Sequence, residues 1–229
     1  PFIKHNIEAT RKAYGLDKIE EREITVDKPL TASDISANNL TIKNLRITEC
    51  SRGIYFENVD TSLIENVTVD LCGNLSGAGI YLESNSDSNT IKNNYAYKNN
   101  YGILLRNARN NFLINNTVSN SRDVGFQIYS TSTTNTLNDN RSSNNGSSGF
   151  YIWSSNGCKL TGNSSINNNG KGFDIQTTTG SVVKNNLAEN NSAEGFYLYF
   201  ISNGNSYFSE NISRNNSNAG FSLDYTNNN

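Results

Sequence analysis

Three charged residues stand at the same place in successive copies of a short motif. Glu57, Glu83 and Arg106 each come four residues after a glycine that begins a run of mostly apolar residues. If consecutive copies form neighbouring parallel strands, the two glutamates lie about 4.8 Å apart at the backbone. That is close to the separation of the carboxyl pair in a retaining glycosidase, so the three residues are candidates for catalysis. The alternative, which we favour, is a solvated ladder of charges, because the short spacings leave little chain for loops that would wall a cleft.

In later copies of the motif, aromatic residues occupy this same position, which we call the column. Other aromatic and polar residues stand two positions before the column in the same copies. Because side chains alternate between the two faces of a strand, this set points outward on one sheet. Aromatic rings can stack on sugar rings while polar neighbours supply hydrogen bonds; they can also stabilise adjacent strands or form a protein interface. We predict a ligand-binding face formed by Tyr129, Tyr151, Trp153, Asp174, Gln176, Tyr197 and Tyr199.

The motif that positions these residues returns eight times. It reads Gly-Phe-Tyr-Ile at residues 149–152, and its glycines, at positions 53, 79, 102, 125, 149, 172, 195 and 220, are 26, 23, 23, 24, 23, 23 and 25 residues apart. Self-similarity at such a period is the signature of a solenoid. A second column, an apolar residue followed three positions later by asparagine, repeats in step, as in Ile91 and Asn94. The apolar residues alternate over only three or four positions, which favours short strands over helices.

Each repeat therefore predicts one coil of about three short strands, paired in parallel with the coils on either side. Phe150 and Ile152 then point inward. Glycine suits the turn into the strand, because it tolerates positive φ and allows close backbone approach. Asparagine amides at equivalent positions can hydrogen-bond along the coil axis. We expect an all-β protein, a single-stranded parallel β-helix of about eight coils.

Two stretches carry a resemblance to a known family. Ser88-Asn-Thr-Ile-Lys-Asn-Asn94 and Asn99-Asn-Tyr-Gly-Ile-Leu-Leu105 resemble the right-handed parallel β-helix repeats of NosD-like and pectin-lyase-like proteins, and the resemblance covers roughly residues 40–229. The resemblance implies that the coils wind as a right-handed β-helix. It does not fix the function, because this fold hosts lyases, hydrolases, epimerases, adhesins and scaffolds. Pectate lyases of this fold combine acidic calcium ligands with a basic arginine. The resemblance therefore implies that Glu57, Glu83 and Arg106 are candidates for a catalytic site.

The N-terminal residues differ in character from the repeats. We expect residues 1–38 to form a small cap with a helix and a short strand, and residues 39–229 to form the β-helix domain. Residues 1–47 also resemble a segment of an uncharacterised family of large membrane proteins, which implies an exported parent protein. The last motif opens a coil that nothing afterwards closes, so we expect the domain to be incomplete at its C-terminal end. A neighbouring chain or further coils would cover that end.

Composition and charge exclude several classes of function. The chain has 19 basic and 21 acidic residues and no basic stripe, which argues against a nucleic-acid partner. It has no apolar run of about 18 residues, so we expect no membrane span. His5 is the only histidine and methionine is absent, so we expect no copper site, other metal or cofactor, and no Ser-His-Asp site in the coils.

Two features bear on the compartment. Cys50 and Cys72 stand in the same register of adjacent coils, within reach of a disulfide that would fit an extracytoplasmic location. Among the Asn-X-Ser/Thr sequences, Asn74 and Asn145 lie beside turn glycines and are the expected glycosylation sites.

The residues thus favour an exported or surface-displayed module without catalysis, structural or carbohydrate-binding, whose partner is a polysaccharide or glycan. The alternatives are a polysaccharide lyase or glycoside hydrolase that uses the glutamate pair, and a self-assembling subunit of a surface layer or filament.

Overall fold

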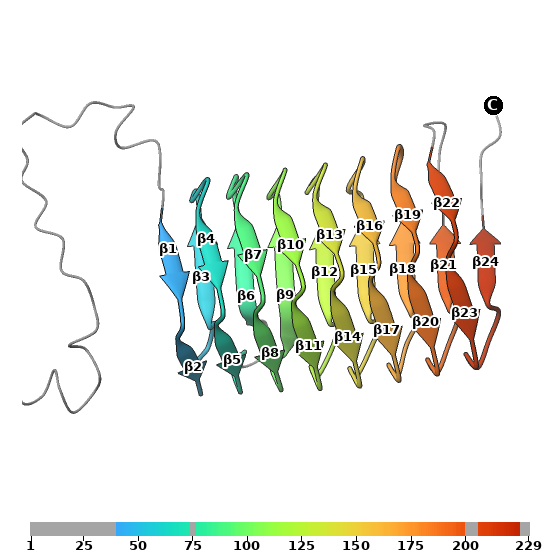
Figure 1. Cartoon of the computed structure of the whole chain (residues 1–229), viewed down its shortest axis with the longest axis horizontal. Coiled ribbons are helices and arrows are strands. Elements are labelled where there is room, and N and C mark those ends of the chain that lie inside the picture. Colours follow the sequence, from blue (N-terminus) through green and yellow to red (C-terminus); the bar gives the residue numbers. More distant parts are fainter. Residues whose placement is uncertain (1–39, 74–76, 200–205, 225–229) are drawn as a thin grey trace, which may run out of the picture. The chain divides into compact units, whose positions relative to one another are not determined.

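The computed structural model describes residues 40–73, 77–199 and 206–224. Within these ranges the chain forms a parallel β-helix without any α-helix, with strands in three sheets of eight (Figure 1). The predicted N-terminal cap and Asn74 lie outside the described residues. The prediction of an all-β solenoid of about eight coils is confirmed.

Every strand pairs in parallel with its equivalents in the neighbouring coils. Sheet A consists of β1 (Thr41–Lys43), β4 (Leu63–Glu65), β7 (Thr90–Lys92), β10 (Phe112–Ile114), β13 (Thr136–Asn138), β16 (Lys159–Thr161), β19 (Val182–Lys184) and β22 (Tyr207–Ser209). Sheet B consists of β2 (Arg46–Thr48), β5 (Thr68–Asp70), β8 (Tyr95–Tyr97), β11 (Thr117–Ser119), β14 (Arg141–Ser143), β17 (Ser164–Ile166), β20 (Leu187–Glu189) and β23 (Ile212–Arg214). Sheet C consists of β3 (Ile54–Glu57), β6 (Ala78–Glu83), β9 (Tyr101–Arg106), β12 (Phe126–Tyr129), β15 (Phe150–Trp153), β18 (Phe173–Gln176), β21 (Phe196–Tyr199) and β24 (Phe221–Asp224).

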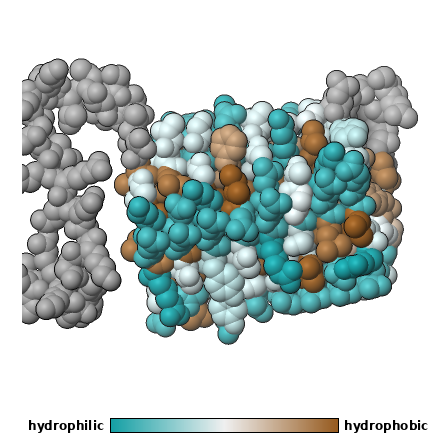
Figure 2. Space-filling model, viewed as in Figure 1, coloured by the Kyte–Doolittle hydropathy of each residue, from teal (hydrophilic) through white to brown (hydrophobic). Residues whose placement is uncertain are grey.

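The core is a set of columns that run along the helix axis. Phe126, Phe150, Phe173 and Phe196 are fully buried and stack face to face, with neighbouring ring centroids 4.7 to 4.8 Å apart. Phe221 continues the stack at 4.6 Å and remains 42% exposed. The face of the β-helix seen in Figure 2 is largely hydrophilic, with hydrophobic residues in small separate patches. The period-two alternation therefore sorts the side chains as expected.

Buried asparagines form a ladder beside this core. In the longest one, each backbone N–H and each Nδ2 donates to the Oδ1 of the asparagine in the next coil, as Asn140 does to Asn163 at 2.9 and 3.0 Å. The Nδ2 also donates to a backbone carbonyl, so every polar group of the rung is satisfied. Its members are Asn94, Asn116, Asn140, Asn163, Asn186 and Asn211.

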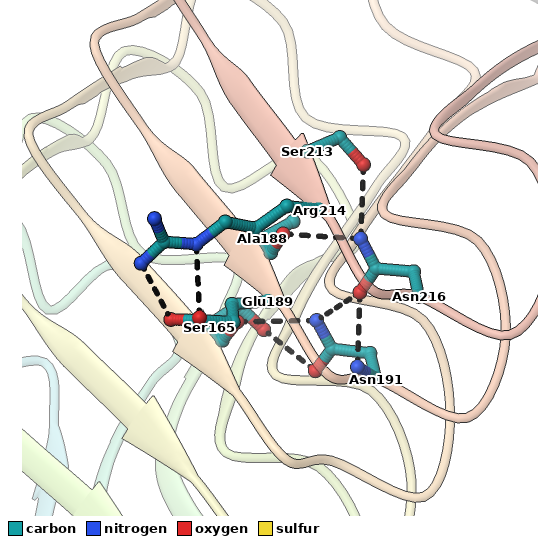
Figure 3. Close-up of polar contacts among 7 residues, drawn as sticks. All are labelled: Ser165, Ala188, Glu189, Asn191, Ser213, Arg214 and Asn216. Carbon is teal, nitrogen blue, oxygen red and sulfur yellow. Dashed lines mark hydrogen bonds and ion pairs between the residues drawn. The ribbon is translucent and has the colours of Figure 1, made fainter.

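Asn145 belongs to another such ladder, which corrects the prediction that it is an exposed glycosylation site. Its side chain is fully buried and donates to the Oδ1 of Asn168 at 2.8 Å. The same pattern continues through Asn191 to Asn216, whose Nδ2 also donates to the carbonyl of Ala188 (Figure 3). The turn glycine beside Asn145 does not expose it, because the asparagine itself points into the coil.

We predicted that the motif glycines serve two purposes, a positive φ and a close backbone approach. The structure confirms the close approach, but none of the motif glycines has a positive φ. Gly149 does not have positive φ; a Cβ there would collide with the Ser165 hydroxyl and lie 2.8 Å from Nδ2 of Asn168. The left-handed turn positions are filled mostly by polar residues, asparagine above all, such as Asn144 at φ 56° and Asn167 at φ 56°.

Cys50 and Cys72 form a disulfide that ties the first coil to the second, with 4.5 Å between their Cα atoms. Cys158 is a buried free cysteine, and burial raises the pKa of its thiol to about 12.

Candidate functional site

The outer face of sheet C carries the column of residues singled out in the sequence. Register pairs Glu83 with Arg106, Arg106 with Tyr129, and Tyr129 with Trp153. The column continues through Gln176 to Tyr199. Because each inward residue of the motif fills the core, every second residue must face out, which places this column on the surface.

An open hollow of about 500 Å³ lies over the middle of this face. Its aromatic walls are Tyr81, Tyr101, Tyr129, Tyr151 and Trp153. Trp153 is 41% exposed, and the tyrosines are half-buried or buried. If the coil formed by β1, β2 and β3 is counted as the first, the aromatic side chains that line the hollow come from coils two to five.

Charged residues line the same hollow in paired and stacked arrangements. Nη1 of Arg106 donates to Oε1 of Glu83 at 3.0 Å, and the Tyr55 hydroxyl donates to Oε2 at 3.0 Å. The guanidinium carbon of Arg52 lies 4.4 Å from the ring centroid of Tyr55 and 5.6 Å from that of Tyr81, within cation–π range. Both oxygens of Glu83 are therefore engaged, whereas Arg52 is held by ring stacking.

Burial raises the pKa of Tyr81, Tyr101 and Tyr151 in the hollow. Desolvation raises the pKa of Tyr81 far above its ordinary value, and it raises the pKa of Tyr101 to about 12, with a further contribution from a hydrogen bond to Asp123. Desolvation likewise raises the pKa of Tyr151, with the charge of Asp174 adding to it. At neutral pH these hydroxyls are intact and can donate hydrogen bonds.

A second, smaller hollow of about 240 Å³ continues the first, with Tyr101, Gln127 and Tyr151 lining both. Its remaining walls are mostly polar and include Asp123, Ser147, Ser148, Asp174 and Gln176. We call the two hollows together the aromatic groove.

Asp174 lies in the wall of the second hollow and is almost completely buried. It accepts hydrogen bonds from Lys171 at 3.1 Å and from Gln176 at 2.8 Å. Burial raises the pKa of Asp174, and the contacts with Gln176 and Lys171 oppose that rise.

The predicted binding residues do not all come together. Tyr129, Tyr151, Trp153, Asp174 and Gln176 line the aromatic groove. Tyr197 and Tyr199 do not line either hollow: their rings stack on each other with centroids 6.2 Å apart. Tyr197 also contacts Lys171, whose Nζ lies 3.6 Å from the ring centroid.

The candidate catalytic residues are adjacent but differ in surroundings. Glu57 pairs in register with Glu83, as the repeat predicted. Glu57 is exposed, whereas Glu83 is fixed by Arg106 and Tyr55. A carboxylate held by two donors is suited to positioning the arginine.

Four residues that line the aromatic groove were not predicted from the sequence to bind a ligand. Arg52 and Tyr101 stand immediately before motif glycines, and Gln127 and Tyr81 stand two residues before the column we followed. The register signal was available for the last two, because Tyr151 occupies their position in a later coil.

Residues 40–73, 77–199 and 206–224 contain no group of three or more His, Cys, Asp or Glu side chains suited to a metal ion. Nor does this part of the chain hold a helix long and apolar enough to cross a membrane.

Comparison with known proteins identifies the family. The model for a right handed beta helix region matches residues 17–141 and 131–229. The chain belongs to this family.

Solved structures of an alginate epimerase and of a mannuronan C-5 epimerase share the fold. The periplasmic alginate epimerase AlgG superposes with a TM-score of 0.62 at 17% identity, covering 80% of this chain and 50% of that protein. The A-module of the mannuronan C-5 epimerase AlgE4 from Azotobacter vinelandii superposes with a TM-score of 0.60 at 16% identity, covering 81% of this chain and 58% of the module. At this identity the likeness concerns the fold.

A short segment also matches curated proteins of a different kind. A UPF0182 protein from Pelobacter propionicus is 53% identical over 47 residues, and one from Clostridium tetani is 41% identical over 58 residues. These segments are 20% and 25% of this chain but only 5% and 6% of the relatives' own lengths.

Proposed function

We propose that this β-helix binds a polysaccharide through the aromatic groove and does not catalyse a reaction on it. The observation that carries the proposal is the groove itself, in which five aromatic side chains from four consecutive coils surround one open hollow. Rigid aromatic rings offer large contact area at low entropic cost, and the hydroxyls and amides around them fix orientation.

The polar groups of the groove suit a ligand rich in hydroxyls. Gln127 and Gln176 offer amide donors and acceptors, and the tyrosines offer hydroxyl groups. The solved proteins that share the fold are named as an alginate epimerase and a mannuronan C-5 epimerase, which supports a polysaccharide as the class of ligand.

We further propose an extracytoplasmic location. The disulfide between Cys50 and Cys72 is of the kind that persists in oxidising compartments. AlgG, which shares the fold, is described as periplasmic.

Affinity electrophoresis tests the binding proposal. The purified chain is run through gels that contain alginate, pectate, cellulose derivatives or mannan, and retardation in at least one of them is expected. The same mixtures are assayed for new reducing ends and unsaturated products. Turnover that Glu83→Gln abolishes would replace the proposal with a lyase or hydrolase; absence of retardation in every gel would contradict it.

A further inference from the structure

The aromatic groove carries opposite charges at different positions along the helix axis. Arg52 and Arg106 line the first hollow, and Asp123 and Asp174 line the second. Arg106 is paired with Glu83 at 3.0 Å. Asp174 is likewise paired with Lys171, at 3.1 Å. Arg52 and Asp123 therefore set the charge that a ligand meets at the two places.

Arg52 is arranged to receive an anionic group. Its guanidinium stacks over Tyr55 and Tyr81, and it forms no ion pair with a carboxylate among the described residues. Among the described residues the guanidinium donates no hydrogen bond, so its N–H groups remain available to a ligand. These N–H groups match the two oxygens of a carboxylate.

Asp123 is arranged to receive a cationic group. Its backbone is fixed on both sides, because its N–H donates to the carbonyl of Asn100 at 3.0 Å and its carbonyl accepts from Ser147 at 3.2 Å. No lysine or arginine forms an ion pair with its carboxylate within the described part of the chain. Asp123 lines the second hollow beside Ser147 and Ser148. Its carboxylate accepts a hydrogen bond from the Tyr101 hydroxyl and keeps further acceptor positions for an ammonium group.

These two positions are separated by a length that one polymer can span. Arg52 precedes β3 in the first coil and Asp123 precedes β12 in the fourth, so three coil spacings, about 14 Å, separate them along the axis. Between them lie aromatic rings and the mutually paired Glu83 and Arg106, so sugar rings can fill the interval. A purely anionic chain would meet uncompensated repulsion at Asp123, and a purely cationic chain would meet it at Arg52.

We propose that the groove selects a zwitterionic polysaccharide, one that carries carboxylate and amino groups on the same chain. Arg52 binds the carboxylate, Asp123 binds the ammonium, and the aromatic rings stack on the sugars between them. This inference rests on the proposed function and names the class of polysaccharide that the groove prefers.

Four polymers with β-linked backbones of glucose or glucosamine provide the test, in a mildly acidic buffer that keeps amino groups protonated. Carboxymethyl chitosan then carries both charges, carboxymethyl cellulose is anionic, chitosan is cationic and hydroxyethyl cellulose is neutral. Binding is measured by isothermal titration calorimetry at low and moderate salt. We expect carboxymethyl chitosan to bind tightest, by about fivefold over either singly charged polymer, which is the upper end for one exposed ion pair. The preference should weaken as salt screens the charges.

Two variants separate the contributions of the charges. Arg52→Gln should bind carboxymethyl chitosan no better than chitosan, and Asp123→Asn should bind it no better than carboxymethyl cellulose. Their melting temperatures verify that the fold is intact. Binding that depends on Trp153 but shows no preference among the four polymers would overturn the charge assignment and leave the proposed function standing. Absence of binding to all four would contradict the charge assignment, whereas the proposed function is contradicted only if no gel retards the chain.

Discussion

Arg106 donates a hydrogen bond to Glu83 across the boundary between two coils, with 3.0 Å between Nη1 and Oε1. The Tyr55 hydroxyl engages the second oxygen of Glu83, so the carboxylate is fixed from both sides. The first hollow of the aromatic groove thus contains a charge-balanced pair surrounded by rings. A ligand must contact mainly the rings there, and the net charge that it meets comes from other residues of the groove.

The asparagine ladder should contribute strongly to stability. Asn163 accepts from the backbone and side chain of Asn140, and its Nδ2 donates to the carbonyl of Leu137 and to Asn186. Asn163→Ala leaves buried groups unpaired, and each costs about 1 to 3 kcal/mol. Urea unfolding should show that loss, whereas Asn138→Ala on the outer face of sheet A should change the unfolding free energy by about 0.5 kcal/mol or less. Equal losses for the two variants would show that the ladder is not a special source of stability.

Glycosylation should avoid the ladder positions. Asn145 and Asn115 both stand in acceptor sequences, but Asn145 is fully buried whereas Asn115 is exposed at a turn with φ 51°. When the chain is produced in a glycosylating host, glycopeptide mass spectrometry should find sugar on Asn115 and none on Asn145, provided that modification follows folding. Glycan on Asn145 in the folded protein would contradict its inward orientation.

Stability should fall at high pH in a way that depends on Tyr101. Burial raises the pKa of Tyr101 from 10.0 to about 12 in the folded chain. The unfolded chain therefore releases the proton first, so the contribution of Tyr101 is complete below pH 10 and is lost as pH rises through 12. Thermal unfolding across this range should show a shallower decline for Tyr101→Phe than for the wild type. Parallel declines would mean that Tyr101 titrates normally.

The sequence predicted the fold because the same physical requirement is repeated in every coil. Phe150, Phe173 and Phe196 occupy one column, and a single error in register would have turned all of them outward. The pairing of Tyr129 with Trp153 follows from the same count.

The local errors arose where two neighbouring positions serve different roles. Asn144 and Asn145 are identical in type, yet Asn144 makes the left-handed turn and Asn145 points into the core. Residue type cannot separate them; only the register of Asn145 with Asn168, Asn191 and Asn216 can. The groove was incomplete in our prediction because Arg52 precedes β3 and Tyr101 is the first residue of β9. At these entries to the strands, the alternation of side chains does not give the direction of either residue.

The most direct test of the account is the affinity of Trp153→Ala for the polysaccharide that most strongly retards the wild type. Phe112→Ala is the matched control, since Phe112 is a similarly exposed aromatic residue, 45% against 41%, on the outer face of sheet A. Titration calorimetry should show about tenfold weaker binding for Trp153→Ala, the loss of roughly one stacking contact, and unchanged binding for Phe112→Ala, with both proteins melting close to the wild type. Wild-type affinity in Trp153→Ala would contradict the claim that the aromatic groove is the binding site.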